Sequence, residues 1–334
     1  CLLLLTIVLL ITSCGHERKI GVDVSKISIS QPFKRFDKEL FSFGDPVNSE
    51  NVKQLRMKYG SFFDLYCSRI IRIHNNDDAL TAKELTQFVS DNDVKEIHRK
   101  TDSLYSNLKD VQEDLLNVFK HYSYYFPNKP VPEIVTYISA FNYQVITADS
   151  ILGIGLDMYL GENCADIYAS ISIPKYMFRR FTRNYIVNDC IKGWFQSECD
   201  PDSVKSELLS QMIYQGKLLY YTDALAPEMS DTIKTGYTKE QLEWCLKNES
   251  NVWAFFIEQK LLYSTVLQEY IKYIDDGPTT NGLPKESPAK IGAWLGWQIV
   301  KMYMNNNPDI TLEQLLKEKD AQKILNNSNY KPKK

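Results

Sequence analysis

The chain has 334 residues, with 39 basic and 42 acidic side chains and a formal net charge of −3. This near balance gives no electrostatic reason to expect a nucleic acid partner. Hydrophobic residues make up 44% of the chain and aromatic residues 12%, which excludes an intrinsically disordered protein. A chain of this length buries either one large core or two modest ones.

An apolar run over 2–11 is followed by Thr12, Ser13 and Cys14, and the sequence then turns polar at once. The run is shorter than the roughly 20 residues that a membrane-spanning helix needs, but it suits a cleaved signal peptide with small residues at the cut. We therefore predict a lipoprotein signal peptide over 1–13 and a lipid on the thiol of Cys14, which anchors the protein to a membrane face. An ordinary signal peptide and a truncated membrane helix are the alternatives.

Apart from Cys1 and Cys14, five cysteines remain, so at least one of them has no disulfide partner within the chain. Cys190 and Cys199 are the closest in sequence and are candidates for a disulfide in an oxidising envelope. No two cysteines have the Cys-x-x-Cys spacing, so neither a zinc knuckle nor a redox dithiol is indicated.

Residues 14–32 mix charge with short apolar pieces and are predicted to form the lipidated cysteine and a tether. We expect a single domain over 33–330, because no internal repeat or low-complexity linker divides the chain. Apolar residues three or four positions apart predict helices in its first part. These helices cover 50–73, 81–90, 93–99 and 102–124, and helical structure ends at Pro127, Pro130 and Pro132.

The pattern changes after these prolines. β-branched and aromatic runs predict strands of one small sheet at 135–138, 143–147 and 151–160. Helical patterns resume after Pro174, with a capping box formed by Thr238 and Gln241. The other predicted helices cover 208–220, 291–304, 311–316 and 321–325, and the one at 291–304 is apolar on nearly every side. The expected fold class is α+β and predominantly helical, with a small central β-sheet flanked by long helices.

Several catalytic motifs are absent from the sequence. None of the four histidines lies three or four residues from another, so the His-Glu-x-x-His pair of zinc peptidases is missing. The Gly-x-Ser-x-Gly elbow of a serine hydrolase is also missing, and neither a phosphate loop nor a dinucleotide fingerprint is complete. These patterns predict no catalytic residue, no metal site and no cofactor.

One carboxylate interrupts an apolar, strand-like run, because Asp157 lies within 152–160. A buried charge without a partner is costly, so this side chain either points to solvent or is paired. The alternation of side chains along a strand favours the solvent.

Basic residues recur every four positions after Pro174, at Lys175, Arg179 and Arg183. This spacing predicts a basic face on a helix. The face is a candidate receptor for an anion or a partner for Asp157, and a solvated or ion-paired face is the simpler interpretation.

Three glycines lie inside predicted helices. Glycine in a helix interior costs about 1 kcal/mol relative to alanine, so Gly216 indicates that another backbone passes close to it. Gly292 and Gly296, four residues apart on another predicted helix, indicate the same. Close packing of two helices accounts for all three.

Several short segments, taken in order, resemble those of one family. They are Arg35-Phe36-Asp37, Tyr125-Phe126-Pro127, Ile154 to Gly161, Pro174-Lys175-Tyr176, Met212 to Lys217, Trp244 with Glu249 and Trp253, Ser287 to Val300, and Asn329 to Pro332. The family is the gliding-motility-associated lipoprotein GldB of the Bacteroidota. The resemblance implies an envelope lipoprotein associated with gliding motility and the secretion machinery linked to it. It implies no established biochemical activity.

The order of elements is also similar to a group of zinc-dependent peptidases. In those proteins a helix with the His-Glu-x-x-His pair follows the sheet, and a glutamate on the next long helix completes the metal site. The histidine-bearing segment would fall within 179–189, where Arg, Asn and Tyr replace imidazoles, and the glutamate at Gln215, an amide and a poor zinc ligand. The similarity implies a peptidase-like scaffold without its metal.

The leading hypothesis is a lipid-anchored envelope protein that acts through protein–protein contacts in motility or secretion. Residues 15–19 lack the acidic run of surface-exported lipoproteins of this phylum, which favours the periplasmic side, and Gly15 directly after Cys14 is compatible with sorting to the outer membrane. The alternatives are a peptidase-like hydrolase with an unrecognised site and a periplasmic binding module for an anionic ligand. The candidate pocket residues are Asp157, Arg179, Arg183 and Gln215.

Overall fold

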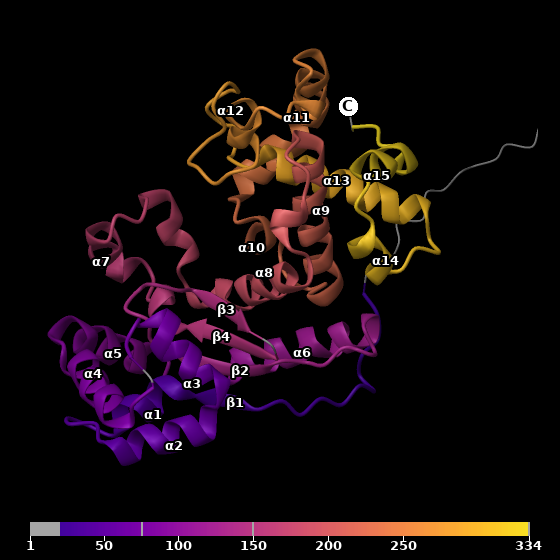
Figure 1. Ribbon diagram of the computed structural model, residues 1–334. Coiled ribbons are helices and arrows are strands. Elements are labelled where there is room, and N and C mark those ends of the chain that lie inside the picture. Colours follow the sequence, from indigo (N-terminus) through magenta and orange to yellow (C-terminus); the bar gives the residue numbers. More distant parts are fainter. Residues whose placement is uncertain (1–20, 75, 149, 333–334) are drawn as a thin grey trace, which may run out of the picture.

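The computed structural model describes residues 21–74, 76–148 and 150–332 (Figure 1). The predicted signal peptide and Cys14 lie outside the described residues, so their prediction stays a prediction. Residues 21–32 form neither helix nor strand and lead directly into the first strand. No helix in the described ranges is both long enough and apolar enough to span a membrane.

A mixed four-stranded sheet lies near the middle of the molecule. It consists of β1 (Phe33–Arg35), β2 (Glu133–Tyr137), β3 (Val145–Ala148) and β4 (Ile151–Gly155), in the order β1-β2-β4-β3. β1, β2 and β4 are parallel, and β3 pairs with β4 in the antiparallel direction at one edge. The predicted strands are therefore confirmed, except that the last one ends early, because Leu156–Tyr159 form a 3-10 helix.

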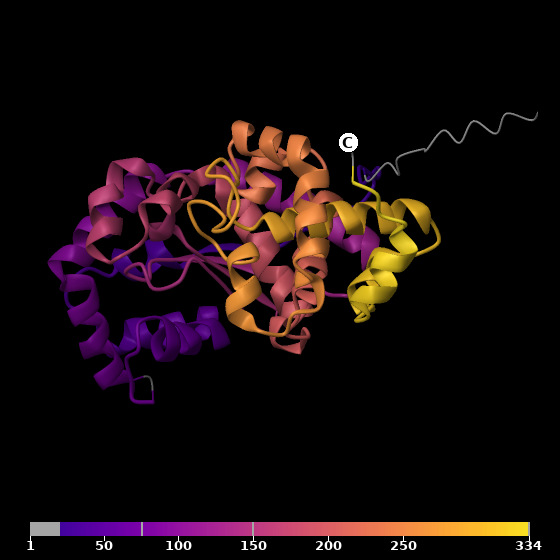
Figure 2. The same cartoon turned by 90° about the horizontal axis from the view of Figure 1, so that it is seen from above.

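The sheet separates two hydrophobic cores. Because neighbouring residues of a strand point to opposite faces, Ile134 and Leu152 pack into one core while Val135 and Ile151 pack into the other. In two perpendicular views the helices around the smaller, N-terminal core and those of the C-terminal half lie on opposite sides of the sheet (Figures 1 and 2).

The smaller core is built by helices that precede the second strand. They are α1 (Phe36–Ser42), α2 (Ser49–Tyr59), α3 (Ser61–Leu65), a π-helical turn (Tyr66–Ile70) and α4 (Asp78–Ser90). The next helix, α5 (Asn92–Leu104), contacts α4. The single helix predicted over 50–73 is wrong, because Gly60 adopts a φ of 51° and breaks it into pieces. Only glycine takes up this left-handed region at little cost.

The helix predicted over 102–124 starts later than expected. α5 ends at Leu104, whose side chain is exposed, and α6 (Lys109–Tyr125) begins after a short connection. In that connection the buried hydroxyl of Tyr105 donates a hydrogen bond to the carbonyl of Tyr159. This long-range contact fixes the break and is not visible in the local pattern.

The larger core is built by α6 and the helices of the second half. These are α7 (Ala165–Ser170), α8 (Ile186–Glu198), α9 (Leu208–Leu225), α10 (Asp231–Thr235), α11 (Lys239–Glu258), α12 (Leu267–Tyr270), α13 (Ile291–Asn306), α14 (Leu312–Lys317) and α15 (Ala321–Ser328). Thr238 and Gln241 form the predicted capping box at the start of α11. α13 is buried along most of its length, as its sequence predicts. The expected fold class is thus confirmed.

Helices α9 and α13 cross at a point where each has a glycine, Gly216 on α9 and Gly296 on α13. A Cβ atom added to Gly216 would lie 2.3 Å from the carbonyl carbon of Gly296, and one added to Gly296 would lie 1.8 Å from the carbonyl oxygen of Met212. Both distances are far below van der Waals contact, so the two backbones meet only because these positions are glycines. The predicted close approach of the two helices is confirmed.

The five cysteines of the described residues are all free thiols, and four of them are buried. Cys190 and Cys199 lie on and just after α8 and are not joined, so the disulfide considered for them is absent. Burial raises the pKa of the Cys190 thiol well above its ordinary value, as expected for an inert core thiol.

Candidate functional site

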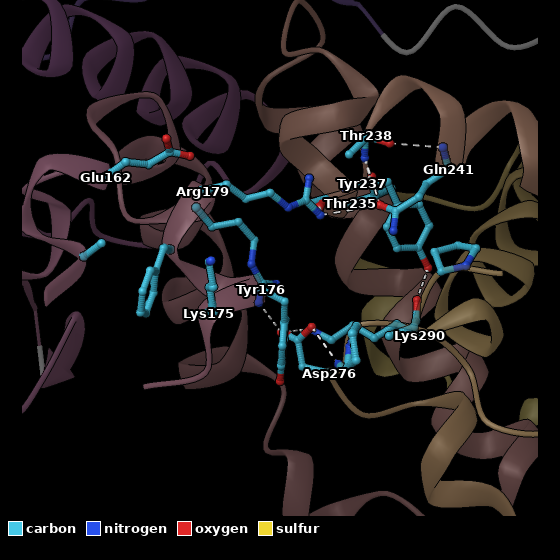
Figure 3. A pocket seen from close by; sticks show the side chains of 18 residues that line it. Glu162, Lys175, Tyr176, Arg179, Thr235, Tyr237, Thr238, Gln241, Asp276 and Lys290 are labelled. Atoms are coloured by element: carbon cyan, nitrogen blue, oxygen red, sulfur yellow. Dashed lines mark hydrogen bonds and ion pairs between the residues drawn. The ribbon is translucent and has the colours of Figure 1, made fainter. Parts of the chain in front are cut away.

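A cavity of about 510 Å³ is lined by residues between positions 162 and 290. Its walls come from the 3-10 helix Lys175–Arg180, from the turn 235–238 between α10 and α11, and from the segments 276–278 and 288–290 that precede α13. Figure 3 shows Arg179 extending toward the turn at Thr235 and Tyr237, with Asp276 and Lys290 on another wall. The volume is within the range of small-molecule sites.

Cationic side chains outnumber acidic side chains in the lining of this cavity. Arg180 and Lys290 both contact the same carboxylate oxygen of Asp276, at 2.5 and 3.0 Å. Burial alone would raise the pKa of Asp276, but the two neighbouring cations outweigh it and hold the pKa below its ordinary value. Asp276 is therefore ionised at neutral pH and bridges two cations from distant parts of the chain.

Arg179 is held by neutral groups. Its guanidinium donates hydrogen bonds to the carbonyl of Gly236 and, at 3.4 Å, to the side-chain oxygen of Gln241. Among the described residues no carboxylate forms an ion pair with Arg179 or Lys175. Their positive charges are thus left to the cavity and the solvent.

Gly236 shapes the wall beside these arginines. It ends α10 with a φ of +75°, and a Cβ atom there would lie 3.0 Å from the Cδ atom of Arg180. Both the backbone conformation and the close approach of Arg180 require glycine at this place.

Two long helices begin at the cavity. Thr238 is the N-cap of α11 and Lys290 is the N-cap of α13, and both line the cavity. The hydroxyl of Tyr237 donates a 2.6 Å hydrogen bond to the carbonyl of Ala289, which ties the two helix starts together. The positive ends of both helix dipoles therefore add to the charge of the side chains.

The predicted basic face is only partly right. Lys175 and Arg179 reach the cavity, but Arg183 does not, because two 3-10 helices, Lys175–Arg180 and Arg183–Tyr185, replace the single helix expected. Arg183 pairs with Asp110 on α6 and stacks over the ring of Tyr105. The side-chain hydrogen bonds to Asp110 lower the pKa of that carboxyl.

The expectation that Asp157 points to solvent is wrong. Its side chain is fully buried just after β4 and accepts hydrogen bonds from the backbone of Ser139, at 3.1 Å, and of Phe141, at 2.7 Å. Desolvation raises the pKa of Asp157 to about 6, although these backbone donors favour its ionised form. Asp157 binds the loop that enters β3 and is not paired with Lys175, Arg179 or Arg183.

Gln215 is half-buried on α9 and does not line the cavity. Asp157, Arg179 and Gln215, considered as a set for a hydrolase, therefore belong to three separate places. Within the described part of the chain no three His, Cys, Asp or Glu side chains gather in a way that fits a metal ion.

Several lining residues were not recognised as candidates from the sequence. Arg180 lies beside the basic series but outside its four-residue spacing, and Thr238 and Gln241 are predicted only as a helix cap. Lys290 belongs to a segment that carries the family resemblance, and Asp276 had no signal at all. Arg180 and Asp276 are 96 positions apart, so only the fold brings them together.

The fold and the cavity define an α-rich α+β protein with a basic pocket. The comparison with family models matches residues 17–332 to the family described as "Gliding motility protein GldB". The chain belongs to this family, and this associates it with gliding motility. Neither the curated proteins nor the solved structures gave a match.

Several residues of the segments that carry the family resemblance contact one another in the fold. Within the first segment, Arg35 forms a 2.6 Å ion pair with the buried Asp37. Tyr330 near the C-terminus donates a 2.7 Å hydrogen bond to the buried Glu249 of α11 and packs edge-on against Trp253. The glycine crossing of α9 and α13 likewise joins two of these segments, 212–217 and 287–300.

Proposed function

We propose that the protein is a lipid-anchored component of the cell envelope that acts in gliding motility, and in the protein secretion linked to it, through protein–protein contacts. The observation that carries the proposal is the family match over residues 17–332. The apolar run that ends at Cys14 supports the lipid anchor. The absence of an acidic run in residues 15–19 supports a protein that faces the periplasm, and Gly15 directly after Cys14 is compatible with an outer-membrane location.

Exposed apolar side chains support the protein contacts. Leu246 and Ile257 on α11 are half or more exposed, as are Tyr263, Val266 and Leu267 in the segment that follows. Residues 11 apart on a helix lie on the same side, about three turns from one another. Exposed apolar side chains that recur on α11 and in the segment after it support a surface that binds another protein.

The anchor is tested by restoring a deletion strain with the wild-type gene or with Cys14→Ala. We expect the wild-type protein to incorporate labelled palmitate, to fractionate with the outer membrane and to restore colony spreading. The Cys14→Ala protein should lose all three, although it folds normally by circular dichroism. Spreading that is fully restored by an unlipidated, soluble Cys14→Ala protein would contradict the role of the anchor.

The proposal includes no catalytic activity. The set considered for a hydrolase does not come together, and a peptidase-like scaffold that has lost its metal remains a hypothesis. Metal analysis of the purified full-length protein tests it, because one equivalent of zinc per chain would overturn the proposal of a purely non-enzymatic role.

A further inference from the structure

We propose that the basic cavity between the 3-10 helix Lys175–Arg180 and the starts of α11 and α13 binds the phosphoryl group of a small phosphorylated molecule. This site goes beyond the protein contacts proposed above and does not depend on them. Its evidence is the charge, the geometry and the walls of the cavity.

The charge of the lining matches a phosphate monoester. Four cations, Lys175, Arg179, Arg180 and Lys290, face two acids, Asp276 and Glu162. The excess of two positive charges balances a phosphate monoester, which carries about −1.5 to −2 at neutral pH. A monocarboxylate would leave part of this excess uncompensated.

The cations already hold one anionic oxygen. Arg180 and Lys290 meet at a single oxygen of Asp276, at 2.5 and 3.0 Å, so their nitrogen atoms converge on one point. Arg179 uses its Nη2 atom on neutral acceptors. A guanidinium has five N–H donors in a fixed fork, so its remaining donors suit two oxygens of a phosphoryl group.

The helix starts favour the same occupant. α11 and α13 have 20 and 16 residues, and the N-cap residue of each lines the cavity. The α13 start has no side-chain cap, because its N-cap is Lys290 in a left-handed conformation. A helix end of this kind adds to the attraction that the four side chains exert on a phosphoryl group.

The walls also accommodate an organic body. Tyr176, Phe178, Pro278 and Pro288 add apolar and aromatic surface to a cavity of about 510 Å³. A free phosphate ion would leave most of this space and surface unused. A ring or short chain esterified to phosphate would use both.

A second cavity of similar size, about 560 Å³, does not have this character. It is lined by five lysines and four acids, and two of the lysines, Lys129 and Lys317, pair with acids of the same lining. Its buried Lys217 donates a hydrogen bond to the carbonyl of Glu318. Its charges are therefore nearly balanced, and it offers no comparable receptor for a dianion.

The test is isothermal titration calorimetry of the full-length protein in detergent, at constant ionic strength. The probes are glucose 6-phosphate, inorganic phosphate, succinate, and the short-chain lipid dihexanoyl phosphatidic acid, whose headgroup is a phosphate monoester. We expect saturable binding of a phosphoryl probe that is tighter than binding of succinate. The phosphoryl probe that binds most tightly tells whether a phosphorylated small molecule or a lipid headgroup supplies the group.

Three variants locate the binding. Arg179→Gln should weaken it about tenfold or more, as expected for the loss of a charge-assisted pair. Lys175→Gln, an exposed position that leaves the fold intact, should weaken it a few-fold. Arg183→Gln is the matched control, since Arg183 pairs with Asp110 outside the cavity, and it should bind like the wild type.

Two results would overturn the proposal. One is that no phosphoryl probe binds, or that succinate binds as tightly as the best of them. The other is that Lys175→Gln leaves binding unchanged while Arg183→Gln weakens it, which would place the anion elsewhere.

Discussion

Asp157 makes the stability of this protein depend on pH in a direction opposite to that of an ion-paired carboxylate. The carboxyl is fully buried, and desolvation raises its pKa from 3.8 to about 6. Between these two pH values the folded protein binds a proton that the unfolded chain has released. The free energy of unfolding therefore falls as the pH rises through this window, and the fall is complete above pH 6.

The size of the effect follows from the shift in pKa. At 1.36 kcal/mol for each pKa unit, ionisation of Asp157 costs the folded state about 3 kcal/mol. Asp157→Asn keeps the shape of the side chain and an oxygen that accepts from Phe141, but it does not titrate. At pH 4 the unfolded chain has already released more than half of this proton, so only part of the effect lies above pH 4. From pH 4 to pH 7 the unfolding free energy of the wild type should therefore fall by about 2 kcal/mol relative to that of Asp157→Asn.

The assay is urea unfolding, followed by tryptophan fluorescence, at half-unit steps from pH 4 to pH 7. Titrations of all other groups cancel in the difference between the two proteins. Asp110→Asn is the control, because hydrogen bonds from Arg183 lower the pKa of Asp110. Its difference from wild type should be flat above about pH 5. A flat difference for Asp157→Asn as well would refute the burial of an ionisable carboxyl at this place.

Two further substitutions test the packing. Gly296→Ala places a Cβ atom 1.8 Å from the backbone oxygen of Met212, so thermal unfolding should show that the protein loses about 3 kcal/mol of stability. The control is Gly21→Ala, whose Cβ atom meets nothing nearer than 4.0 Å and which should change the stability by no more than about 0.5 kcal/mol. Equal stability of the two variants would disprove the close crossing. Lys234→Met removes the ammonium that contacts the buried carboxylate of Asp223 at 2.8 Å and should cost about 3 kcal/mol. Adding Asp223→Asn should recover most of that loss, and no recovery would mean that the ion pair is not the cause.

The sequence predicts best what depends on local periodicity and backbone chemistry. The capping box of Thr238 and Gln241 is confirmed because its residues are three positions apart and its hydrogen bonds are local to the start of the helix. The burial of α13 is confirmed because a helix that is apolar on all sides is stable only when every side packs inside the protein. Gly216 and Gly296 predicted a close crossing because nothing else justifies glycine inside a helix.

The candidate site was predicted only in part, because it depends on long-range contacts. The spacing of Lys175, Arg179 and Arg183 was treated as helical, but the chain turns after Arg180 and sends Arg183 toward α6. Asp157 was assigned to solvent because the sequence does not show that a loop will supply backbone N–H groups to it. A local pattern can identify a charged residue but not the partner that determines its direction.

The most direct test of the proposed function is photo-cross-linking in living cells. A photoreactive amino acid is placed at Leu246 or Ile257 on α11, and at Met57 on α2 as a control that is even more exposed. We expect Leu246 and Ile257 to give adducts that mass spectrometry identifies as components of the gliding or secretion machinery, and Met57 to give none of them. No such adducts from α11, or the same adducts from Met57, would contradict a role through specific protein contacts.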